Sequence, residues 1–187
     1  MGNKHKHLCP CGSGKRASVC CRQVSHTMKL TLTPDTKLEM RRKVAALAEA
    51  GKHLEACEIL EQLAAVSPHN PLIWNDLGIQ YEASGQIDKA LHAWRRGYES
   101  DSTYPPILYN LGKFTLERFM NFRKTGELTN AETQRSLKEA INLLNANLDR
   151  DPDNADAHYH LALAYALDQD EQRAHAHRTI ALRIKQE

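Results

Sequence analysis

The chain has 187 residues, of which 41% are hydrophobic and 26% charged, so it can bury a core and is not disordered by composition. No stretch approaches the roughly 18 apolar residues of a membrane-spanning helix, and no apolar segment follows the basic N-terminus as in a secretory signal. We therefore expect a cytoplasmic protein, in whose reducing surroundings the five cysteines serve as metal ligands or free thiols rather than disulfides.

Charge is unevenly divided along the chain. The first 34 residues hold six basic side chains and no acidic one, which leaves 19 basic against 23 acidic residues in the remainder, a formal charge of −4. Such a basic segment is typical of a surface that meets a polyanion or an acidic protein, but a solvated tail has the same composition. We expect a head over residues 1–27, a linker over 28–36 and a body over 37–187.

The head contains four cysteines with the spacing C-x-C-x8-C-C, at Cys9, Cys11, Cys20 and Cys21. A segment this short cannot bury enough apolar surface to fold alone, whereas a Zn²⁺ ion held tetrahedrally by four thiolates would supply the missing stability. Four cysteines complete a closed site, which indicates a structural ion rather than a catalytic one. The alternatives are a vicinal disulfide or free thiols, which leave the glycines between the cysteines unexplained.

This string resembles the SEC-C zinc motif, a short module of the bacterial preprotein-translocase motor that is also appended to other proteins. The family pattern is Cys-x-Cys-Gly-Ser-Gly-Lys, then after a gap Cys followed by His or Cys, and it is matched from Cys9 to Lys15 and at Cys20 and Cys21. The resemblance implies one structural zinc ion. The chain departs from the family at Arg22, where a glycine is usual, and this affects the expected partner surface more than the metal.

The body repeats every 34 residues. Ala56 and Ala90 are 34 positions apart, as are Ala140 and Ala174. The pattern Trp74-x2-Leu77-Gly78-x2-Tyr81, followed by Ala90, resembles the tetratricopeptide repeat. The resemblance covers four units, at 37–70, 71–104, 105–154 and 155–187, and implies an all-α solenoid of about four helical hairpins with eight helices.

Turn and breaker residues agree with this spacing. Gly51 and Gly85 fall between the paired helices, where a left-handed residue ends the first helix. Pro71 and Pro105 stand at first helical positions, where a missing N–H is harmless. Small residues on the first helices, such as Gly78, are expected to meet the repeated alanines where the two helices cross.

The third unit contains 16 extra residues. The stretch from Leu116 to Arg123 continues without a helix breaker, Lys124–Leu128 is typical of a turn, and Thr129 or Asn130 can cap the next helix. We predict that both helices of this unit are about two turns, or roughly 10 Å, longer than the others. Phe119, Met120 and Phe122 would pack against Leu137, Ile141 or a neighbouring helix, with an exposed partner-binding tip as the alternative.

Tetratricopeptide arrays hold a partner on the concave face formed by their first helices. By repeat position, that face would contain Arg41, Arg42, Asn75, Asp76, Ile79, Tyr109, Asn110, Lys113, Tyr159, His160 and Leu163. The mixture is polar, aromatic and weakly charged. It lacks the Lys and Asn set with which chaperone-binding relatives grip a C-terminal carboxylate, and Asn110 alone matches one such position.

No catalytic constellation emerges from the motifs. The phosphate-loop pattern fails because Arg16 takes the Ser/Thr place. Two pairs of histidines, His158/His160 and His175/His177, are spaced two apart on helices, which favours surface or groove residues over a metal pair. Cys57 follows the repeated Ala56 and is expected to pack as a small apolar side chain.

The leading hypothesis is therefore a non-enzymatic adaptor. Its repeat groove would bind a partner protein, while the zinc head would dock on an acidic partner that is chaperone- or ribosome-associated. The alternative hypothesis is that the basic head binds RNA or the ribosome.

Overall fold

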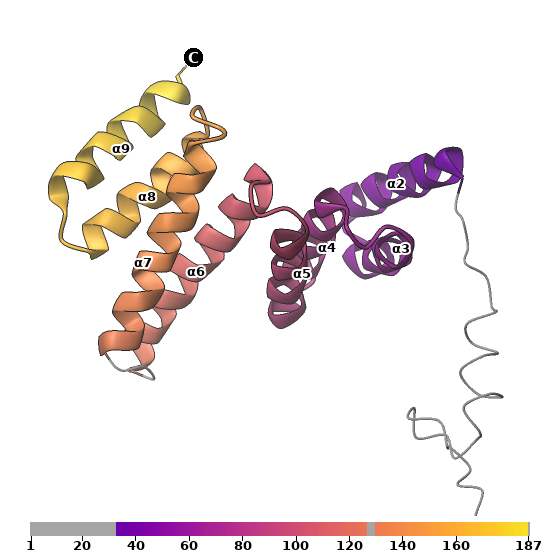
Figure 1. Cartoon of the computed structure of the whole chain (residues 1–187), viewed down its shortest axis with the longest axis horizontal. Coiled ribbons are helices and arrows are strands. Elements are labelled where there is room, and N and C mark those ends of the chain that lie inside the picture. The colour runs from indigo at the N-terminus through magenta and orange to yellow at the C-terminus, as the bar shows by residue number, and fades with distance from the viewer. Residues whose placement is uncertain (1–32, 127–129, 187) are drawn as a thin grey trace, which may run out of the picture. The chain divides into compact units, whose positions relative to one another are not determined.

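The computed structural model describes residues 33–126 and 130–186, and all of its regular elements are α-helices (Figure 1). The predicted zinc ligands Cys9, Cys11, Cys20 and Cys21 lie outside these residues. The eight helices are α2 (Pro34–Glu49), α3 (His53–Val66), α4 (Pro71–Ala83), α5 (Ile87–Ser100), α6 (Pro105–Thr125), α7 (Asn130–Leu148), α8 (Ala155–Leu167) and α9 (Glu171–Ile184). An all-α architecture with eight helices in the described chain was expected.

The chain divides into two compact units, residues 1–40 and 41–187, and α2 crosses the boundary. In the first unit, α2 begins at Pro34, three residues before the expected start of the repeats at 37. Thr33 is the reason, because its hydroxyl oxygen accepts a hydrogen bond from the backbone N–H of Thr36 at 3.2 Å. This is an N-cap followed by a proline at the first helical position, which together favour helix initiation.

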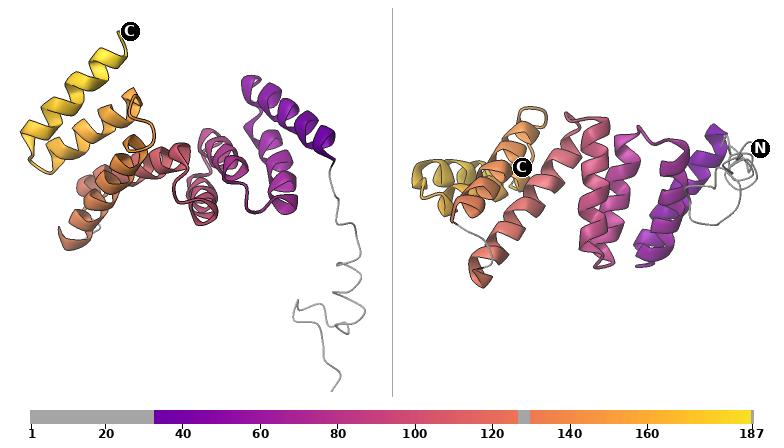
Figure 2. Two further views of the ribbon diagram at one scale, coloured as in Figure 1. Left: turned by 45° about the horizontal axis from the view of Figure 1, so that its top comes forward. Right: turned by 60° about the horizontal axis from the view of Figure 1, so that its bottom comes forward.

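In the second unit, consecutive helices pack as antiparallel pairs. The pairs α4/α5, α6/α7 and α8/α9 lie side by side in Figures 1 and 2. Gly85 joins α4 to α5 with φ +77°, and Gly51 follows α2 with φ +71°, as the sequence predicts. Gln169 stands between α8 and α9 with φ +64°. A residue with a side chain is strained in this left-handed region, so the backbone at Gln169 is more strained than at Gly51 and Gly85.

The repeated small residues make room for large side chains. Ala56, Ala90 and Ala140 are fully buried. The atoms nearest to Gly78, however, belong to the indole of Trp94, and those nearest to Gly112 belong to Leu143 and Leu144. Close approach of the paired helices thus depends on a glycine facing the large residue that follows the alanine by four positions, rather than on the alanine alone.

The third hairpin is longer than the second. Helix α6 has 21 residues against 13 in α4, and α7 has 19 against 14 in α5. The extension of α6 is about 12 Å, or two turns, and that of α7 somewhat more than one turn. Phe119 is only 3% exposed and packs in one cluster with Leu137 and Ile141, as expected, whereas Phe122 stays partly exposed. The added length is therefore stabilised by its own apolar contacts.

Within residues 33–126 and 130–186, none of the helices is both long enough and apolar enough to cross a membrane.

Candidate functional site

The eleven residues predicted to bind a partner lie on α2, α4, α6 and α8, the first helices of the four hairpins. We call this surface the first-helix face. Two contacts between neighbouring first helices join residues that are 35 positions apart. Arg41 lies 4.0 Å from Asp76 across α2 and α4, and the Asn110 side-chain amide donates to Asn75 Oδ1 at 2.9 Å across α4 and α6.

These two contacts provide partners for Asn75 and Asp76 of α4. Asn75 and Asn110 are 5% and 8% exposed, so their mutual hydrogen bond replaces water and neither amide is available to a partner. Burial raises the pKa of the Asp76 carboxyl, and the nearby Arg41 and the Asn75 side chain act in the opposite direction. In the structure, the two asparagines join neighbouring repeats.

Lys113 is also paired within the protein. Its ammonium group lies 2.8 Å from Glu82 Oε1, and the two side chains are 19% and 29% exposed. Because Arg41 and Lys113 both face carboxylates, the first-helix face carries little uncompensated positive charge where these helices meet. The weakly charged character expected from the sequence follows from this pairing.

Aromatic side chains dominate the junction of α6 and α8. The rings of Tyr109 and His160 meet edge-on with centroids 5.6 Å apart, and Tyr159 meets His160 in the same way at 5.4 Å. Burial, and then the neighbouring Asp156, raise the pKa of Tyr109 to about 12. Tyr159 remains 50% exposed, which makes it the most accessible aromatic group of this face.

The remaining predicted residues differ in accessibility. Ile79 is 38% exposed on α4. Arg42 is exposed on α2, whereas Leu163 is half-buried and packs against the core cluster of the last two hairpins. Ile79 and Tyr159 are therefore the apolar and aromatic groups that this face offers to a partner.

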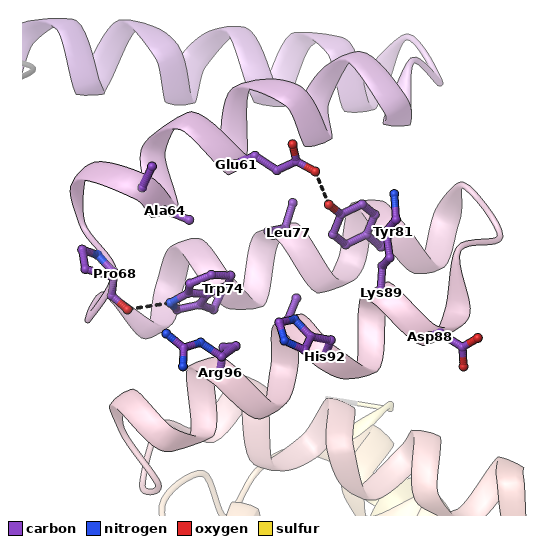
Figure 3. A pocket seen from close by; sticks show the side chains of 12 residues that line it. Glu61, Ala64, Pro68, Trp74, Leu77, Tyr81, Asp88, Lys89, His92 and Arg96 are labelled. Atoms are coloured by element: carbon purple, nitrogen blue, oxygen red, sulfur yellow. Dashed lines mark hydrogen bonds between the residues drawn. The ribbon is translucent and has the colours of Figure 1, made fainter. Parts of the chain in front are cut away.

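Sequence reasoning did not anticipate a groove on another surface, between α3 and α5 (Figure 3). We call it the α3–α5 groove. Its volume is about 630 Å³ and its floor is a stripe along α4 made by Trp74, Leu77 and Tyr81. Lys89, His92 and Arg96 follow its α5 edge at the same spacing. The sequence signal that could have indicated this groove is the equal spacing of the apolar residues on α4 and the basic residues on α5.

Aromatic side chains of this groove are held by polar contacts. The Trp74 indole N–H donates to the Pro68 carbonyl oxygen at 2.7 Å, and the Arg96 guanidinium lies over the Trp74 ring at 5.6 Å. At the other end, Lys89 lies over the Tyr81 ring at 5.3 Å, and the Tyr81 hydroxyl donates to Glu61. Hydrogen bonds of this kind fix the rings in one orientation before any partner arrives.

A histidine pair joins the last two helices and corrects an expectation. His158 is 7% exposed rather than a surface residue, and its Nδ1 lies 2.8 Å from Nδ1 of His177. His158 Nε2 donates to the Pro152 carbonyl oxygen at 3.0 Å, so in its neutral form Nδ1 accepts from His177. Burial lowers the pKa of His177, and His158 and Arg173 lower it further.

Other chemistry-bearing groups form no reactive arrangement in the part of the chain that the structure describes. There, no three His, Cys, Asp or Glu side chains gather in a way that could hold a metal ion. Cys57 is 3% exposed and packs in the core as expected, and burial together with Glu61 raises the pKa of its thiol to about 11. A thiol held protonated in this way is a poor nucleophile.

Residues 126–177 match the family model described as "Tetratricopeptide repeat". No curated protein is similar enough in sequence to count as a relative.

Solved structures have the same fold. A crystal structure of MamA shares 17% identity over 91% of this chain and 88% of its own, with a TM-score of 0.61. A tetratricopeptide repeat protein from Parabacteroides merdae shares 21% identity over 81% of this chain and 54% of its own, at 0.58. A human IFIT1 dimer with m7Gppp-AAAA shares 17% identity over 82% of this chain and 37% of its own, at 0.64. The helical hairpins are therefore of the tetratricopeptide type.

Proposed function

We propose that the protein is a non-enzymatic adaptor whose first-helix face binds a segment of a partner protein. The observation that supports this most directly is the internal pairing of the polar groups on that face. Arg41 and Lys113 each face a carboxylate, and apart from the exposed arginines of α2 the most accessible groups are Tyr159 and Ile79. Tyrosine is one of the side chains from which protein–protein contacts gain most of their energy, and an exposed isoleucine adds apolar area that a partner can bury.

A nucleic acid fits this face less well. Binding to phosphates depends on Lys and Arg side chains that are free to replace counterions. The human neighbour is a structure with the nucleotide m7Gppp-AAAA. In this chain, by contrast, Glu82 lies 2.8 Å from Lys113, so a phosphate would have to displace a carboxylate from its partner. We therefore assign the first-helix face to a protein segment.

A crosslinking pull-down from cell extract tests this assignment. The double variant Tyr159→Ala/Ile79→Ser removes accessible groups from the first-helix face and leaves the helices' core untouched. Tyr98→Ala is the matched control, because Tyr98 is 39% exposed but lies on α5. We expect the double variant to lose about tenfold or more of at least one captured protein, since two central contacts of about 1 kcal/mol each combine to that factor. The assignment would be contradicted if the parent protein, the double variant and Tyr98→Ala all captured the same proteins in equal amounts.

We further propose that residues 1–27 form a second module, in which Cys9, Cys11, Cys20 and Cys21 hold one structural zinc ion and basic side chains dock on an acidic chaperone- or ribosome-associated protein. The support is the cysteine spacing and the five basic residues, without an acidic one, in residues 1–27. Repeating the pull-down with a chain that lacks residues 1–27 separates the partners of the two modules. The proposal for the head is wrong if truncation leaves every captured protein in place.

The same excess of basic residues supports a second candidate function, binding of RNA by the head. Five phosphate contacts would give a slope of about −3.5 to −4.5 for the logarithm of affinity against the logarithm of salt concentration. Filter binding with RNA and with the chain lacking residues 1–27 measures this slope. RNA retention that is absent, or independent of salt, removes this candidate.

A further inference from the structure

The α3–α5 groove is long enough to hold two turns of an α-helix. From Trp74 to Tyr81 its floor follows seven positions of α4, or about 10 Å. Ala64 and Ala65 on the α3 side and Ala93 on the α5 side are small, and this leaves the volume open above Leu77. Trp74 is the half-buried member of the floor, and its indole is fixed by the hydrogen bond to Pro68.

Charge is distributed unequally over the two edges of this groove. Lys89, His92 and Arg96 are all exposed and lie one helical turn apart along α5. Asp88 points away from the floor in Figure 3, and Glu61 on the α3 edge accepts the hydrogen bond of Tyr81. The α5 edge therefore presents two cations, Lys89 and Arg96, with His92 between them, beside an aromatic floor.

These cations can be engaged at little cost. Arg96 forms an ion pair with Glu99 at 3.2 Å, but both side chains are about half exposed or more, at 47% and 63%. An exposed ion pair of this kind contributes little to stability. Replacing Glu99 by a partner's carboxylate as the ion-pair partner of Arg96 therefore changes the free energy little. The Arg96 guanidinium can stay over the Trp74 ring when this happens.

We infer that the α3–α5 groove is a second docking surface, which takes an acidic amphipathic helix of a partner protein. Apolar side chains of that helix at i, i+3 or i+4, and i+7 rest on Trp74, Leu77 and Tyr81, and carboxylates on its flank face Lys89, His92 and Arg96. The turn spacing of about 5 Å along both stripes matches successive turns of a helix. Charge argues against the protein's own head as occupant, because residues 1–34 contain six basic side chains and no acidic one.

This surface is independent of the first-helix face, so it can be tested separately. Two displayed libraries of helical peptides, each about 14 residues long, are selected on the intact chain. Both are randomised among Leu, Met and Phe at the anchor positions, and the flanking positions are Glu in one library and Lys in the other. Selected peptides are then titrated by tryptophan fluorescence, and a change in emission on binding is assigned to Trp74 because the completely buried Trp94 cannot contact a peptide.

The discriminating variant is Lys89→Glu/Arg96→Glu, which reverses charge at exposed positions that the core does not use. Arg95→Glu is the matched control, since Arg95 is exposed on α5 but does not line this groove. We expect enrichment from the Glu library, a change in Trp74 emission, and affinity that falls about tenfold or more in the double variant but less than twofold in Arg95→Glu. The peptides should bind Tyr159→Ala/Ile79→Ser normally.

Three results would overturn the inference. The first is equal enrichment from the Glu and Lys libraries. The second is binding that survives Lys89→Glu/Arg96→Glu or is lost in Tyr159→Ala/Ile79→Ser, which would place the peptides on another surface. The third is self-association of the intact chain, measured by light scattering, that the double charge reversal abolishes, because the occupant would then be a second copy of this chain.

Discussion

Gly78→Ala provides the sharpest test of how the hairpins pack. In an open helix this change would stabilise the protein by about 1 kcal/mol, since alanine has the higher helix propensity. Here, however, an added Cβ would lie within 2.6 Å of ring atoms of Trp94. Carbon atoms at rest are separated by about 3.5–4.0 Å, so either the indole or the helix must move by roughly 1 Å.

The indole of Trp94 has little freedom to move. It is completely buried, and its ring packs against Phe114 with centroids 6.0 Å apart. Overpacking of a filled core costs about 1–3 kcal/mol, and three close ring contacts place this site at the upper end or above. After the propensity gain is subtracted, we expect Gly78→Ala to lower the free energy of unfolding by about 2 kcal/mol, and the Tm by about 4–8 °C for a chain of this size.

Urea unfolding followed by circular dichroism measures this effect. Gly112→Ala is the comparison, because the nearest atom that its Cβ would meet lies 2.8 Å away on Leu144, against 2.3 Å on Trp94 for Gly78, and we expect a smaller loss of stability than for Gly78→Ala. The double variant Gly78→Ala/Trp94→Leu should cost at least about 1 kcal/mol less than the sum of its single changes, because the smaller leucine relieves the contact. A stabilising Gly78→Ala, or strict additivity with Trp94→Leu, would refute this account of the hairpin.

Three further outcomes are expected. Metal analysis of the purified protein should find one zinc ion per chain, lost in Cys9→Ser; a full complement in that variant would contradict the proposed ligand set. The lowered pKa of His177 means that the folded state binds fewer protons than the unfolded state, so stability should fall as pH drops below about 6.5, and urea titrations from pH 8 to 5 should show a shallower fall for His177→Gln than for the parent protein. Phe119→Ala should lower the free energy of unfolding by about 3–5 kcal/mol. Phe122→Ala should lower it by well under half as much in the same assay, because Phe122 is partly exposed. Equal losses for the two variants would show that the longer hairpin is not packed as described.

Much of the local structure could be predicted from the sequence. Pro71 and Pro105 begin helices and Gly51 and Gly85 end hairpin turns, because these residues restrict or extend the backbone angles by themselves, whatever packs around them. The repeat spacing indicated which helices pair. Helix α2 begins at Pro34, within the stretch expected to be a linker, because Thr33 there supplies the capping hydroxyl.

The candidate site shows the opposite case. Repeat position placed Asn110 on the first-helix face, but only the packed helices show that its side-chain amide is hydrogen-bonded to Asn75. The helical spacing of two histidines indicated surface residues, yet His158 is buried against His177 of the next helix.

The sequence by itself therefore determined the helices, their turns and their order, because each depends on residues within about one repeat. The tertiary structure alone decided which polar groups are satisfied and which remain available, and it formed the α3–α5 groove. Burial and pairing of this kind join residues tens of positions apart, and they depend on how closely particular side chains let neighbouring helices approach.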